Sequence, residues 1–83
     1  MMMGGHSQPR EPSDEERDMF IAQKAAVEAQ TGEQYPNTFV PIACTSQVVA
    51  GTNFWVKFWT DTGFVHVKIF RPLPHTGNPP NVV

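Results

Sequence analysis

The spacing of hydrophobic positions changes once along the chain, and the change separates a predicted helix from predicted strands. Over residues 14–30 the apolar residues form a thin stripe at helical spacing, made of Met19, Phe20, Ala26 and Val27. Ser13 and Glu16 have the spacing of a capping box, and acidic residues follow Ser13 where the helix dipole favours negative charge. We therefore predict a helix over residues 14–30, with Gly32 as its C-terminal cap.

After residue 37 the spacing shortens to two, which is typical of β-strands. In the first alternating run we expect Val40, Ile42 and Cys44 to share one face. In the two later runs we expect the core-facing positions to be Phe54, Val56, Phe58, Val65, Val67 and Ile69. Residues 60–63, Thr-Asp-Thr-Gly, suit the hairpin turn between these runs. The predicted fold class is α+β, with one N-terminal helix packed on an antiparallel β-meander.

Both ends of the chain lack this periodicity. Residues 1–12 mix Met, Gly, Pro and polar residues, which predicts a flexible N-terminal arm. Residues 72–83 are rich in proline, which predicts an irregular C-terminal tail. With 83 residues in total, we expect residues 1–83 to form a single domain.

Composition excludes several classes of function. Six Lys and Arg against eight Asp and Glu argue against nucleic acid and anionic membranes as partners. The only cysteine, Cys44, cannot form an internal disulfide, and no signal peptide is evident, so we expect a cytoplasmic protein. We expect neither a cofactor nor a metal site, because the histidines are scattered at His6, His66 and His75. No catalytic pair is evident, so we expect no enzyme activity.

An uncharged segment lies between the first two predicted strands, from Gln47 to Gly51. Hairpin tips usually use Asn, Asp, Pro or Gly, whereas this one offers Val48, Val49 and Ala50. In one interpretation the two valines only extend the strand and residues 50–53 make the turn. In the other, apolar side chains are exposed at the tip for a partner.

A second apolar feature is Leu73, which lies between Pro72 and Pro74 and is followed by His75. The prolines favour polyproline geometry, which would present Leu73 to a partner at low entropic cost. One alternative is an irregular tail with no binding role. Another is a ligand for an aromatic-lined domain that binds polyproline segments.

Large aromatic residues alternate with the expected core positions. We expect them on the outer face of the sheet, either as a recognition surface or as cross-strand pairs that cover it; they are Trp55, Trp59, Phe64 and Phe70.

Taken together, the separated motifs resemble those of the stefins, the single-domain cytosolic branch of the cystatin superfamily of cysteine protease inhibitors. The resemblance rests on Gly4-Gly5 near the start, residues 47–51 continuing into Thr52-Asn53 and an aromatic residue, the strand at residues 64–70, and Leu73-Pro74-His75. It spans residues 1 to about 80, and the joint occurrence of the motifs is far more specific than any one of them.

The resemblance implies a cystatin-like fold and a function as a reversible competitive inhibitor of papain-like cysteine proteases such as cathepsins. In that family the arm and two hairpin loops form a wedge that fills the active-site cleft without offering a scissile bond. The residues implied to bind the protease are Gly4, Gly5, Gln47, Val48, Val49, Ala50, Gly51, Leu73, Pro74 and His75.

One departure from the family concerns the last strand. Stefins have a further strand after the second loop, whereas this sequence ends at Val83, and residues 78–81 are not expected to replace it. The strand at residues 64–70 would then be an open edge. We therefore expect lower stability than in longer relatives, and a possible homo-oligomer or domain-swapped dimer. The alternative function is a non-inhibitory binding module that self-associates through this edge.

Overall fold

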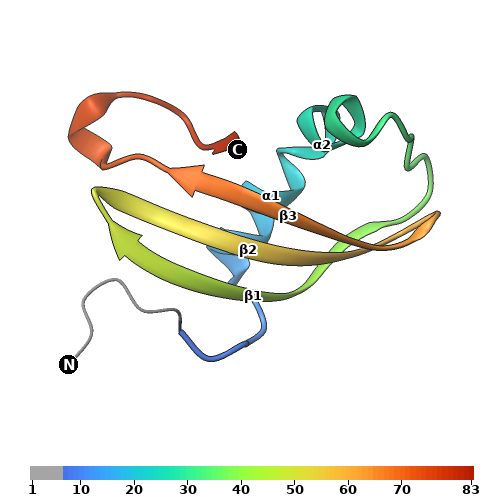
Figure 1. Ribbon diagram of the computed structural model, residues 1–83, viewed down its shortest axis with the longest axis horizontal. Helices are drawn as coiled ribbons and strands as arrows, with labels where there is room; N and C mark the ends of the chain where they lie inside the picture. Colours follow the sequence, from blue (N-terminus) through green and yellow to red (C-terminus); the bar gives the residue numbers. More distant parts are fainter. Residues whose placement is uncertain (1–6) are drawn as a thin grey trace.

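A four-stranded antiparallel sheet packs one face against two short helices (Figure 1). The computed structural model describes residues 7–83. In chain order the elements are α1 (Asp14–Ile21), α2 (Lys24–Thr31), β1 (Phe39–Val49), β2 (Gly51–Thr60), β3 (Gly63–Arg71), the 3₁₀ turn η1 (Pro74–Thr76) and β4 (Asn81–Val82). The strands lie in the order β1-β2-β3-β4, which confirms the predicted α+β meander. None of the helices within residues 7–83 has the length and apolar character needed to cross a membrane.

The helical segment begins and ends as predicted but is interrupted in the middle. Ser13 caps α1 through a complete capping box with Glu16, and Gly32 caps α2 with a φ of 74°. Between the helices, the amide of Gln23 donates to the carbonyl of Phe20, so the last turn of α1 tightens. Residues 21–24, Ile-Ala-Gln-Lys, contain neither Gly nor Pro, so the local sequence did not predict this interruption.

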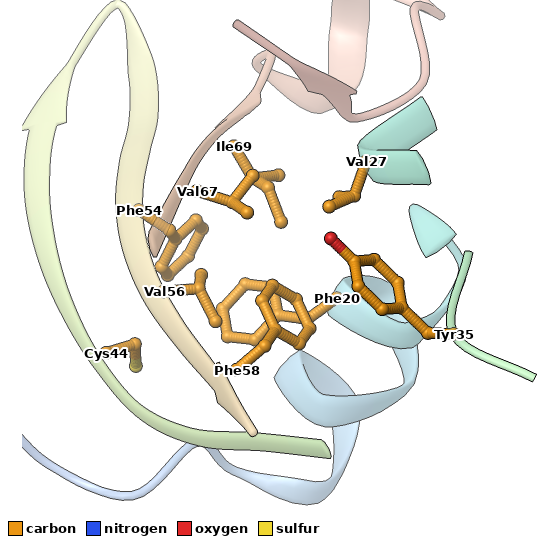
Figure 2. Close-up of a cluster of buried hydrophobic side chains, with 9 residues drawn as sticks. All are labelled: Phe20, Val27, Tyr35, Cys44, Phe54, Val56, Phe58, Val67 and Ile69. Atoms are coloured by element: carbon orange, nitrogen blue, oxygen red, sulfur yellow. The ribbon is translucent and has the colours of Figure 1, made fainter. Parts of the chain in front are cut away.

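The core lies between the helices and the inner face of the sheet (Figure 2). Its buried residues are Phe20, Val27, Tyr35, Cys44, Phe54, Val56, Phe58, Val67 and Ile69. The rings of Phe20 and Phe54 meet edge to face at 5.2 Å, which ties α1 to β2. The faces predicted for β2 and β3 are therefore confirmed, and so is the burial of Cys44.

The face predicted for the start of β1 is wrong because the strand contains a β-bulge. The pairing passes directly from Pro41 opposite Phe58 to Ala43 opposite Lys57, which leaves Ile42 without a partner. Pro41 therefore faces the core, while Val40 and Ile42 are each 38% exposed. A bulge adds one residue to a strand, so the residues before it point to the opposite face from the one that strict alternation predicts. The alternating pattern of the sequence does not reveal the bulge.

Residues 7–12 are not the loose arm that the sequence predicted. Ser7 donates from its amide to the carbonyl of Ser46 at 2.8 Å, and Arg10 forms an antiparallel bridge with Cys44. These contacts satisfy backbone groups on the outer edge of β1, which would otherwise need water. This pairing could not be predicted from local sequence patterns, because Ser7 and Ser46 are far apart along the chain.

The prediction that residues 72–83 are irregular, and that β3 has an open edge along its whole length, is also wrong. Asn81 pairs with Phe70, Val82 pairs with Ile69, and the amide of Val83 donates to the carbonyl of Lys68 at 2.9 Å. The prolines at 79 and 80 precede this strand rather than interrupt it, and proline favours extended backbone in the residue before it. Within the described chain, residues 63–67 of β3, and Arg71 at its end, lack a strand partner on this edge.

An ion pair joins the N-terminal segment to α1. The Arg10 guanidinium donates to both carboxylate oxygens of Glu16, at 2.6 and 2.8 Å, and the backbone amide of Ser13 donates to the same carboxylate. Only 14% of the Glu16 side chain is exposed. The hydrogen bond from Arg10 outweighs desolvation and lowers the pKa of Glu16 from 4.5 to about 2.

We expect Glu16→Gln to lower the free energy of unfolding by about 1–2 kcal/mol near neutral pH. The pKa of Glu16 is lower in the folded than in the unfolded protein, so the stabilisation is complete above 4.5 and is lost as the pH falls toward 2. Urea unfolding at several pH values should show the parent and the variant converging in acid. Glu11→Gln, at an exposed position, is the control. A stability gap that does not change with pH would contradict this account.

Candidate functional site

The β1–β2 hairpin ends in a very tight apolar tip. Val49 pairs with Gly51, so Ala50 alone forms the turn. The valines do extend the strand, as one interpretation held, but the shorter turn also places them at the exposed tip. Val48 is 70% exposed and Val49 is 46% exposed. Gln47 lies just behind them, where its side-chain carbonyl accepts a hydrogen bond from Asn53.

Gly51 allows this tip to lie directly against the end of β3. Its φ is +121°, a conformation that residues with a side chain rarely adopt. A Cβ atom at this position would lie 2.6 Å from the Arg71 carbonyl oxygen and 2.8 Å from the Phe70 ring. Gly51 is therefore needed for its backbone freedom and also for the close contact between the hairpin and β3.

The segment after β3 forms a second ordered loop. Leu73 has φ −60° and ψ 143°, the polyproline geometry that its flanking prolines predict. The Leu73 carbonyl accepts hydrogen bonds from the amide and the hydroxyl of Thr76, at 3.1 and 2.8 Å. Leu73 is 39% exposed, and Pro74 and His75 beside it are also exposed. The loop thus presents an apolar side chain on a hydrogen-bonded frame.

The two loops lie at the same end of the sheet (Figure 1). Gly51 and Leu73 line a shared hollow of about 390 Å³, which Arg71 and Glu15 also border. We call the surface formed by residues 47–51 and 73–75 the loop edge. Apart from His75, the loop edge contains no ionisable side chain.

Gly4 and Gly5, the other predicted site residues, lie outside the described residues. The described chain begins at Ser7, whose hydroxyl accepts a hydrogen bond from the amide of Ser46 at 2.9 Å. Ser46 is the residue before Gln47, so the N-terminal segment runs beside the strand that carries the first tip.

The loop edge has no groups suited to covalent catalysis. Cys44 is only 2% exposed, and burial raises the pKa of its thiol, which disfavours the thiolate. Within residues 7–83, no cluster of three or more His, Cys, Asp or Glu side chains could hold a metal ion. The loop edge can instead present apolar side chains, held in fixed positions, to a complementary cleft.

Sequence reasoning found the exposed residues of the loop edge but missed those that support it. The strand predicted over residues 64–70 does not indicate that Phe70 and Arg71 contact Gly51. The available signal was Gly51 itself, because a glycine in an otherwise apolar tip often marks a close approach of two backbones.

The chain is similar to several known proteins along nearly its whole length. It is 35% identical to leukocyte cysteine proteinase inhibitor 1 of Sus scrofa, over 95% of this chain and 77% of that protein. It is 34% identical to cystatin-B of Macaca fuscata fuscata and 32% identical to human cystatin-B, in each case over 95% of this chain and 81% of the relative. No family model matches the chain.

We expect Gly51→Ala to destabilise the protein more than Gly63→Ala. Both glycines have positive φ, +121° and +113°, but only at Gly51 does the added Cβ meet other atoms. Gly63→Ala should cost about 1–2 kcal/mol from backbone strain, and Gly51→Ala about 1–3 kcal/mol more from overpacking.

The free energies of unfolding of the two variants, measured by urea denaturation, test this expectation. Equal losses would show that contact between the first tip and β3 contributes nothing beyond the turn conformation.

Proposed function

Because this chain belongs to the stefin family, the type 1 cystatins, we propose that it is a reversible competitive inhibitor of papain-like cysteine proteases, including cathepsins. The observation that carries the proposal is the loop edge, where two apolar loops far apart in sequence are packed together by Gly51. The family assignment also separates the chain from enzymes, in agreement with the sequence prediction.

Inhibition by the loop edge would depend on preorganised apolar contact. Val48 and Leu73 project from ordered backbone, so little conformational entropy is lost when they enter pockets of the protease. Residues buried at the centre of such contacts usually supply most of the binding energy. In this proposal residues 47–51 and 73–75 occupy the primed side of the cleft, and Gly4 and Gly5 occupy the non-primed side.

The proposed inhibition requires no chemical step. The loop edge contains neither a nucleophile nor an acid–base pair, and in the proposal no peptide bond of the inhibitor is aligned for cleavage. Binding and release are therefore both non-covalent, and the inhibitor competes with substrate for the same cleft.

We also propose that the protein acts in the cytoplasm. Its single cysteine, Cys44, is a free thiol in the core, and oxidation there would disturb packing. A reducing compartment suits such a residue.

A second candidate function is self-association, in place of inhibition. Residues 63–67 of β3 have no strand partner on the outer edge within the described chain, and an unpaired edge is a template for another strand. A second copy pairing there would give a dimer, and exchange of the C-terminal segment would give a domain-swapped one.

We expect Val48→Asp to weaken inhibition of papain by about 30-fold or more, because a carboxylate would be buried in an apolar pocket. Val40→Asp is the matched control, since Val40 is also an exposed valine of β1 but lies outside the loop edge. Inhibition constants for the parent and both variants, with folding checked by circular dichroism, provide the measurement. If the parent in large excess leaves papain fully active, the proposed function is wrong.

Sedimentation separates the two candidates. If the edge at residues 63–67 drives self-association, Val48→Asp should keep the parent's dimer, because the first tip is not part of that edge. A parent that remains monomeric across a wide concentration range would remove the second candidate and leave the first one unaffected.

A further inference from the structure

The outer face of the sheet, opposite the helices, contains a groove of about 470 Å³. Three consecutive residues from each of three strands line it: 43–45 of β1, 55–57 of β2 and 66–68 of β3. The groove therefore crosses the strands instead of following an edge. Pro9, from the segment that pairs with β1, also lines it.

The strand register explains the shape of this groove. Cys44 pairs with Val56 and Val56 with Val67, and the side chains of this row point into the core, so the row presents only backbone to the outer face. The neighbouring rows point outward and form two walls. One wall carries Trp55 and Lys68, which are paired, and the other carries Lys57 and His66.

The lining is apolar in its centre and cationic at its walls. Lys57 Nζ lies 4.2 Å from the centre of the Phe64 ring, and Lys68 Nζ lies 5.4 Å from the Trp55 ring. The described residues supply neither lysine with a carboxylate partner, since their ion pairs involve only Arg10 and Arg71. None of the described residues that line the groove is acidic. Two lysines held against aromatic rings next to an apolar floor thus create a local positive charge that no residue among 7–83 neutralises by an ion pair.

We propose that this groove binds small amphipathic anions, meaning an aryl or alkyl carboxylate whose apolar body lies on Trp55 and whose carboxylate is bound by Lys57 and Lys68. The volume falls within the range of small-molecule sites, roughly 300–1,000 Å³. Charge complementarity selects an anion, and the Trp55 ring selects a flat or extended apolar body. Because the groove is open, we expect modest affinity.

The site is separate from the loop edge. Its residues lie in the middle of β1, β2 and β3, whereas the loop edge lies at the strand ends. The inference therefore goes beyond protease inhibition and does not depend on it. A groove that crosses three strands also differs from a strand-pairing site, which needs a free backbone edge such as residues 63–67.

The test is a titration of the full chain with naphthylacetate, followed by backbone amide chemical shifts. The expected result is saturable shifts at residues 43–45, 55–57 and 66–68. Naphthylacetamide, which has the same ring system but no charge, should bind about tenfold more weakly. This comparison uses the unmodified protein, so it does not depend on whether a variant folds.

Two variants test whether the charges of Lys57 and Lys68 contribute to naphthylacetate binding. The double change Lys57→Gln with Lys68→Gln should weaken naphthylacetate binding by about tenfold. Lys24→Gln, in α2 on the helical side of the sheet, should leave it unchanged. The proposal is overturned if the acid and the amide bind equally, if the double variant binds like the parent, or if shifts are absent. It is also overturned if only an acidic peptide or a second copy of the chain perturbs this face, with shifts centred on residues 63–67.

Discussion

The absence of a side chain at Gly51 is the constraint on which the loop edge depends. Any Cβ there would overlap the Arg71 carbonyl oxygen and the Phe70 ring, so only glycine lets the first tip lie against the end of β3. The second loop begins directly after Arg71. A single contact between backbones therefore sets the spacing of two apolar loops, and the relative position of Val48 and Leu73 follows from it.

The two ends of the sheet are stabilised in different ways. At the far end, the Asp61 carboxylate of the β2–β3 turn accepts hydrogen bonds from the amides of Asn37 and Thr38, the second at 2.7 Å, so polar groups fix that end. At the loop edge, Gly51 lies against the Arg71 carbonyl oxygen and the Phe70 ring, and residues 47–51 themselves carry no charge. A partner there meets little polar surface that must be desolvated, which suits insertion into a cleft. The ion pair between Arg10 and Glu16 meanwhile fixes the segment that approaches the first tip from the N-terminal side.

The sequence predicted those parts of the structure whose cause is local. The capping box at Ser13, the alternation of Phe54, Val56 and Phe58, and the polyproline geometry of Leu73 each follow from a few adjacent residues. The missing parts have distant causes. Ser7 pairs with Ser46, and Val82 pairs with Ile69. For the loop edge, the exposed residues could be predicted from composition and from the resemblance to stefins, but the contact of Gly51 with Arg71 could not.

The β-bulge at Ile42 divides β1 into two segments, one before and one after residue 42. Each segment has its own pairing register with β2. Ile42 stands outside the ladder, so removing it would leave every existing pair in place, whereas removing one residue between Ala43 and Val49 would turn the following side chains to the opposite face. Loss of one residue can therefore be accommodated at position 42 without moving the first tip.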